Sequence, residues 1–80
     1  MARTKETDRE KFLRLAGKRV PAAIKAIRLI GNLSNKSNYD YTETDVRKIV
    51  NALQEELYDC KKKFQFAEKK RHIKMKFSLE

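Results

Sequence analysis

The 80-residue sequence has little of what compact folds use to turn the chain, with two glycines and one proline, and it has no tryptophan, one cysteine and one histidine. So few turn-forming residues exclude the many short strands of sandwiches and barrels and the glycine-rich loops of nucleotide-binding folds. A single cysteine excludes an intramolecular disulfide, and one cysteine with one histidine cannot build a Cys/His metal site. The apolar runs are too short to cross a bilayer. These absences predict a small all-α protein without a metal or other cofactor.

Basic residues dominate the charge, because 20 Lys and Arg face 11 Asp and Glu, which leaves a net charge of +9. The first residues, 1–11, are rich in charge and contain no apolar stretch, so we expect no secretory signal and a cytoplasmic location. A chain of this length forms one domain over residues 1–80, and its core contributes only a few kcal/mol. Self-association is therefore expected to add stability.

The first predicted helix covers about residues 8–30. Thr7 and Glu10 have the spacing of a capping box, and Gly31 is expected to stop the helix. Apolar or small residues recur at alternating steps of three and four at Leu13, Ala16, Val20, Ala23, Ile27 and Ile30. Pro21 lacks a backbone N–H and clashes with the carbonyl four residues earlier. A kink near Pro21 is predicted, and the alternative is a break that divides the chain into three helices.

A loop over residues 31–42, rich in Asn and Ser, precedes the second predicted helix at about 43–71, with Thr42 as its N-cap. Its apolar stripe has the same alternating steps at Val46, Val50, Leu53, Leu57, Cys60, Phe64 and Ala67. The basic residues 72–80 alternate polar and apolar side chains, which is typical of a strand, yet no partner strand exists in the chain. We expect a flexible tail there, with continued helix or pairing with another chain as alternatives.

The two apolar stripes match in antiparallel register. A turn at the loop places six pairs in successive layers: Ile30 with Val46, Ile27 with Val50, Ala23 with Leu53, Val20 with Leu57, Ala16 with Cys60, and Leu13 with Phe64. Small residues then face larger ones, as close packing requires. This register predicts an antiparallel helical hairpin with Cys60 buried. Further apolar residues outside the stripes predict that two hairpins assemble as a dimeric four-helix bundle: Phe12, Leu15, Ile24, Leu29, Ile49 and Phe66.

The segment IRLIGNLSNKSNYDYTETDVRKI, residues 27–49, resembles the central segment of a group of small uncharacterised bacterial proteins, many of them associated with mobile elements. The resemblance extends to about Phe64 and depends on the Gly-Asn-Leu-Ser-Asn loop and the Tyr-x-Tyr-Thr cap at fixed spacing. It implies a helical fold and no particular activity. Pro21 departs from the continuous helix that such relatives would have.

Charge is distributed unevenly along the chain. Residues 1–30 and 61–80 are strongly basic, whereas residues 31–60 contain more acids than bases. A hairpin would bring the two basic ends together, and such a basic pole suits the phosphate backbone of a nucleic acid. The predicted nucleic-acid-binding residues are Arg9, Lys11, Lys61, Lys62, Lys63, Lys69, Lys70 and Arg71.

The loop offers a second, weaker candidate site, because its amides and two aromatic rings could stack on bases or hold a peptide. Its residues are Asn32, Asn35, Asn38, Tyr39 and Tyr41. The structural alternative is favoured, in which the Asn and Ser side chains satisfy the backbone of the turn while Leu33, Tyr39 and Tyr41 cap the open end of the hairpin.

No catalytic constellation is recognisable, so the protein is predicted not to be an enzyme and no small-molecule substrate is evident. The leading hypothesis is an accessory protein that binds nucleic-acid phosphates with low sequence specificity. The alternative is a protein-interaction or assembly module without a nucleic-acid role. Docking of the segment from Lys69 to Phe77 on an anionic membrane surface is a weaker third hypothesis.

Overall fold

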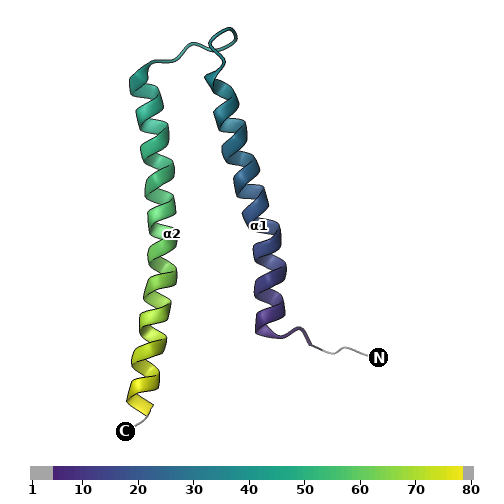
Figure 1. Cartoon of the computed structure of the whole chain (residues 1–80), viewed down its shortest axis with the longest axis vertical. Coiled ribbons are helices and arrows are strands. Elements are labelled where there is room, and N and C mark those ends of the chain that lie inside the picture. The colour runs from purple at the N-terminus through teal and green to yellow at the C-terminus, as the bar shows by residue number, and fades with distance from the viewer. Residues whose placement is uncertain (1–4, 79–80) are drawn as a thin grey trace. The chain divides into compact units, whose positions relative to one another are not determined.

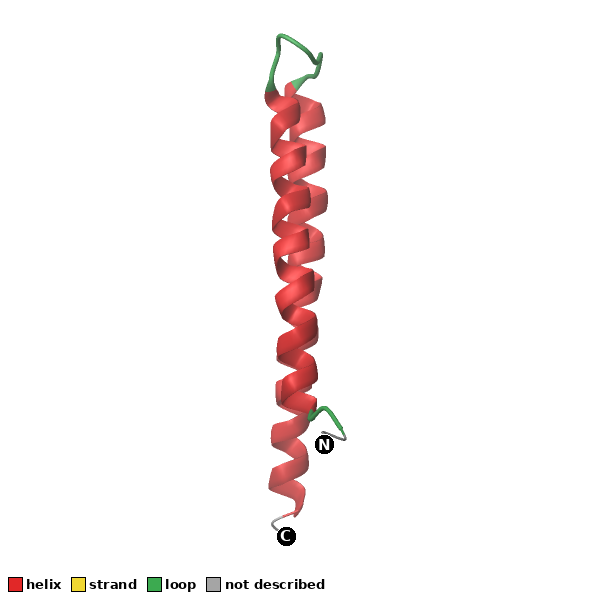
Figure 2. Cartoon of the chain, turned by 90° about the vertical axis from the view of Figure 1, so that its right-hand side faces the viewer, coloured by secondary structure: helices red, strands yellow, loops and turns green. Residues whose placement is uncertain are grey.

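The computed structural model describes the backbone of residues 5–78 and the side chains of residues 5–69. The elements are an α-helix α1 (Asp8–Gly31), a short 3-10 helix η1 (Asn32–Ser34) and an α-helix α2 (Glu43–Ser78). Figure 1 draws α1 and α2 each as one uninterrupted ribbon, and helix and loop account for all of the described chain in Figure 2. The chain divides into two units, Met1–Asp40 with α1 and Tyr41–Glu80 with α2. The predicted all-α class with two α-helices is confirmed.

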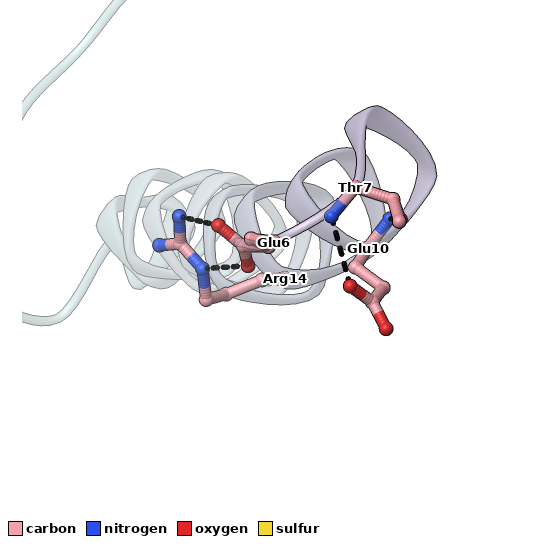
Figure 3. Close-up of polar contacts among 4 residues, drawn as sticks. All are labelled: Glu6, Thr7, Glu10 and Arg14. Carbon is pink, nitrogen blue, oxygen red and sulfur yellow. Dashed lines mark hydrogen bonds and ion pairs between the residues drawn. The ribbon is translucent and has the colours of Figure 1, made fainter. Parts of the chain in front are cut away.

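The start of α1 is fixed by a capping box. The backbone N–H of Glu10 donates to Thr7 Oγ1 at 3.0 Å, and the backbone N–H of Thr7 donates to Glu10 Oε1 at 2.9 Å (Figure 3). These bonds occupy two backbone donors that a helix start otherwise leaves without partners. The helix therefore begins at Asp8, where the sequence predicts it.

Pro21 lies inside α1, and the helix is continuous on both sides of it. The predicted alternative of a break, which would have produced a third α-helix, is wrong. Proline removes one hydrogen bond and strains one turn, whereas the neighbouring residues Ala22, Ala23 and Ala26 are the best helix formers. The local loss at Pro21 is smaller than the cost of ending one helix and nucleating another.

Gly31 does not stop α1 in the way the sequence predicts. It is the last residue of the helix and has right-handed dihedral angles, φ −59° and ψ −30°, so it does not adopt the left-handed conformation of a glycine cap. The α-helix instead passes directly into the tighter turn of η1, as helix ends often do. The predicted position of the end is thus correct to one residue, and its predicted mechanism is wrong.

The connection to α2 is organised around Asn35. Its backbone carbonyl accepts from the N–H groups of Asn38 and Tyr39, both at 3.0 Å, and its side-chain Oδ1 accepts from the N–H of Ser37 at 3.0 Å. The loop then ends at Thr42, whose Oγ1 accepts from the N–H of Asp45 at 3.1 Å while Asp45 Oδ2 accepts from the N–H of Thr42 at 2.9 Å. This reciprocal pair confirms Thr42 as the cap of α2.

The second helix is longer than the sequence predicts. It continues past the expected end at Arg71 as far as Ser78, so helix replaces the expected flexible tail over residues 72–78, and residues 79–80 lie outside the described part. No glycine or proline follows Gly31 in the chain. With a run of good helix formers and no residue to break it, each further residue adds one hydrogen bond to an existing helix.

The apolar stripes of both helices are accessible in this single chain. Among residues 5–69 no side chain is buried. Leu57 is 70% exposed and Phe64 is 60% exposed, although both belong to the stripe of α2. Cys60, expected to be buried, is exposed as well. A single helix cannot cover a stripe on its own surface, so burial of these residues requires a second surface.

Candidate nucleic-acid interface

Six of the eight predicted nucleic-acid-binding residues lie in α2. Lys61, Lys62, Lys63 and Lys69 have exposed side chains, and we call these four the lysine cluster. None of the four forms an ion pair with an acidic residue of the described part. Lys70 and Arg71 are also in α2, but their side chains lie outside the described part. The lysine cluster thus offers accessible ammonium groups for a polyanion.

Arg9 and Lys11 lie in the first two turns of α1 and belong to the other unit. Both side chains are exposed, and the guanidinium carbon of Arg9 is 5.8 Å from the centre of the Phe12 ring. An Arg at this distance from an aromatic ring is attracted by its π-face. The convergence of these two residues with the lysine cluster remains a prediction.

One ion pair next to this region was missed by the sequence reasoning. Arg14 Nε lies 2.7 Å from Glu6 Oε2, and Arg14 Nη2 lies 2.9 Å from Glu6 Oε1 (Figure 3). The hydrogen bonds from Arg14, aided by its charge, lower the pKa of Glu6 and raise the pKa of Arg14. Glu6 precedes the helix, so helical spacing rules did not reveal the pair.

One residue of the candidate loop site, Asn35, has a clear structural role. Asn35 binds the backbone on both its carbonyl and its side-chain oxygen, as described above. Asn32 opens η1, and Asn38 donates its backbone N–H to Asn35. Tyr39 is 48% exposed and Tyr41 is partly covered. These contacts agree with a turn that satisfies its own backbone, which is the structural alternative favoured by the sequence.

A group of aromatic and basic side chains on α2 was not recognised from the sequence. Tyr58 is 60% exposed, and Lys62 Nζ lies 5.4 Å from the centre of its ring. Phe66, one turn beyond Lys62, is 68% exposed, and Lys69 follows it by three residues. Tyr58, Lys62, Phe66 and Lys69 therefore lie along one side of the helix. The spacing of four, four and three residues was the signal that could have revealed this stripe.

Comparison with known proteins adds no functional assignment. No protein-family model, no curated protein and no solved structure matches the chain. Within the described residues, no helix combines the length and apolar character required to cross a membrane. The resemblance of residues 27–49 to small bacterial proteins therefore remains a prediction.

Proposed function

We propose that the protein is a small, non-enzymatic accessory protein that binds the phosphates of nucleic acids with low sequence specificity. The observation that carries this proposal is the lysine cluster, which presents four exposed ammonium groups within about two turns of α2 and has no acidic partner in the described part. Lysines that contact phosphates displace condensed counterions, and this release drives association. Such contacts position a protein on nucleic acid without reading bases.

The salt dependence of binding tests this proposal. The variant K61Q/K62Q/K63Q should bind DNA and RNA more weakly irrespective of sequence, and the slope of log affinity against log salt should fall by about one for each phosphate that the variant no longer neutralises. The matched control is K18Q/R19Q/K25Q, which removes three positive charges from α1. Fluorescence anisotropy over a salt series measures both variants against the unaltered chain.

Two results would contradict the proposal. The first is an absence of binding by the unaltered chain at low salt. The second is an equal loss of affinity in the α1 control, because only the net charge of the chain would then matter and not the cluster.

We also propose that the two helices pair as an antiparallel hairpin and that two hairpins form a dimeric four-helix bundle. The supporting observation is the exposure of both apolar stripes, including Val20 at 55% and Leu57 at 70%. Large exposed apolar surfaces mark association sites. In the proposed register, Arg9 and Lys11 lie opposite residues 65–68, which would join them to the lysine cluster as one basic pole.

The proposed bundle also supports the alternative function, which is a protein-assembly module without a nucleic-acid role. Sedimentation equilibrium distinguishes the states, and a dimer mass over a range of concentrations is expected. A dimer that shows no affinity for DNA or RNA at low salt would favour the assembly module. A stable monomer with a cooperative unfolding transition would exclude the bundle.

A further inference from the structure

We propose that the stripe of Tyr58, Lys62, Phe66 and Lys69 binds single-stranded nucleic acid, with bases stacking on the two aromatic rings and phosphates on the lysines. This inference rests on the proposed function and names the substrate class of the same region of α2. Aromatic rings alternate with ammonium groups along the stripe, and proteins that hold single strands without sequence preference combine the same two groups. The alternation thus matches the alternation of base and phosphate in a single strand.

The position of Phe66 on the helix separates it from the apolar stripe. Phe66 follows Phe64 by two residues, and two residues correspond to about 200° of rotation around an α-helix. Phe64 belongs to the stripe that pairs in the proposed hairpin, so Phe66 lies on the opposite side of α2. Pairing through the stripe would therefore leave Phe66, exposed to 68%, in solvent. A large exposed aromatic ring away from the hairpin seam calls for another partner, either the second hairpin of the proposed bundle or a ligand.

The surroundings of Phe66 favour a polyanion as that partner. Lys62 and Lys63 lie four and three residues before Phe66, and Lys69 lies three residues after it. Lys62, Phe66 and Lys69 also line one shallow hollow of the surface, and the rest of its lining is Phe64, Gln65 and one acid, Glu68. From Tyr58 to Lys69 the helix carries four lysines and two carboxylates. An aromatic ring surrounded by positive charge suits a ligand that has planar faces and a negatively charged backbone.

Tyr58 provides the second platform. It lies about 12 Å from Phe66 along the helix axis, and the ammonium group of Lys62 is 5.4 Å from its ring centre. This contact places the cation over the ring, so a stacking base would displace the ammonium group from the ring to the neighbouring phosphate. A duplex keeps its bases stacked inside and offers no free base face to either ring. Single strands should therefore bind more tightly than duplexes.

The decisive experiment uses the full chain and compares oligothymidylate with a DNA duplex of the same length by fluorescence anisotropy. Phe66→Ala should weaken binding of oligothymidylate by about five- to tenfold, which is the lower end of the range for loss of one stacked base. Its affinity for the duplex should stay unchanged. Phe66→Leu should behave like Phe66→Ala, because leucine is apolar but has no planar face, and Phe66→Tyr should keep the affinity of the unaltered chain.

Two further variants strengthen the test. Phe66→Trp introduces the only tryptophan of the chain, and oligothymidylate should quench its fluorescence while the duplex does not. Tyr39→Ala removes an exposed ring from the loop, the weaker candidate site, and should reduce affinity less than Phe66→Ala does. The opposite order would place the stacking site in the loop. Circular dichroism of each variant confirms that the helices are retained.

The outcomes separate this inference from the proposed function. If K61Q/K62Q/K63Q loses affinity and Phe66→Ala does not, phosphate binding stands and the stacking site is wrong. If the unaltered chain binds neither oligothymidylate nor duplex at low salt, both proposals are wrong. Retained affinity in Phe66→Leu also overturns stacking. The unaltered chain and Phe66→Ala are also compared on phosphatidylcholine vesicles that contain phosphatidylserine. If the substitution abolishes vesicle binding and leaves nucleic-acid binding unchanged, the stripe is a membrane-docking surface.

Discussion

Single side chains decide where both helices begin. Thr7 with Glu10 and Thr42 with Asp45 form the same reciprocal pattern of side-chain oxygen and backbone N–H, with all four distances between 2.9 and 3.1 Å. The aspartate in the second pair replaces the usual glutamate and still reaches the N–H of the cap residue. Each threonine stabilises its helix by roughly 1 kcal/mol, the typical value for an N-cap. The contribution is local, so it does not depend on what either helix contacts.

The Glu6–Arg14 pair predicts a pH dependence at the N-terminal end of α1. The pKa of Glu6 is lower in the folded chain than its ordinary value of 4.5 because Arg14 donates two hydrogen bonds to it. A lowered pKa means that the folded chain binds fewer protons, so the stabilisation is present above pH 4.5 and is lost as the pH falls through the lowered pKa of Glu6. An NMR titration of the Glu6 carboxyl carbon measures this value.

Substitution of the partner checks the cause of the shift. In Arg14→Gln the titration midpoint of Glu6 should move back toward 4.5, whereas Lys18→Gln, which removes a positive charge further along α1, should leave it in place. An unchanged midpoint in Arg14→Gln would show that the hydrogen bonds do not cause the shift.

Within each helix, the continuous run of backbone hydrogen bonds outweighs a local defect. The first helix contains both Gly17 and Pro21 and still runs without interruption from Asp8 to Gly31. An α-helix maintains its geometry through hydrogen bonds on both sides of a defect, so one missing bond lowers stability without ending the element. The same argument explains why α2 reaches Ser78, because nothing in its sequence opposes propagation.

Pro21→Ala should therefore stabilise the protein. Alanine restores the missing N–H, and the difference between proline and alanine inside a helix is up to about 3 kcal/mol. Gly17→Ala serves as the matched variant, since a Cβ at Gly17 would meet nothing within 4 Å beyond its chain neighbours and the adjacent backbone of its own helix. It should add about 0.5 to 1 kcal/mol. Urea unfolding followed by circular dichroism measures both. A destabilised Pro21→Ala would mean that the proline is required by a packing arrangement between helices.

For the molecule as a whole, we propose that association determines stability. The chain has no buried side chain among residues 5–69, and folding depends on burial of apolar area to offset the loss of chain entropy. Two amphipathic helices can meet this requirement by pairing with each other and with a second copy. Leu53 is the one side chain among residues 43–69 that is already partly covered, and the proposed register places it at the middle of the seam.

Leu53→Ala should destabilise the proposed bundle by about 2 to 5 kcal/mol, because it removes a buried side chain and leaves a cavity. Phe66→Ala is the control on the same helix. Phe66 lies on the side of α2 away from the seam, so the free energy of unfolding of this variant should differ little from that of the unaltered chain. Thermal unfolding at several protein concentrations measures both variants. An unchanged melting temperature in Leu53→Ala would contradict the register.

The helical class, the two helix starts and the lysine-rich segment of α2 follow from the amino-acid sequence alone. Capping depends on residues three positions apart, and helical periodicity depends on residues three and four apart, so the sequence predicts both directly. The three-dimensional structure decided how far the elements extend and what their surfaces present. It showed that α1 continues through Pro21, that Gly31 stays right-handed and that Asn35 organises the loop.

The structure alone also identified the contacts that join separate turns, namely Glu6 with Arg14 and Lys62 with Tyr58. A helix end is a balance between propagation and fraying, and a side-chain contact depends on which rotamers the backbone allows. The end of α2 and the Glu6–Arg14 pair are not encoded at a fixed spacing in the sequence, whereas the spacing of four between Tyr58 and Lys62 was a signal for their contact. The sequence reasoning grouped Phe66 with the residues that predict the dimeric bundle, and its place on α2 beside Lys62 is the basis of the stacking site proposed above.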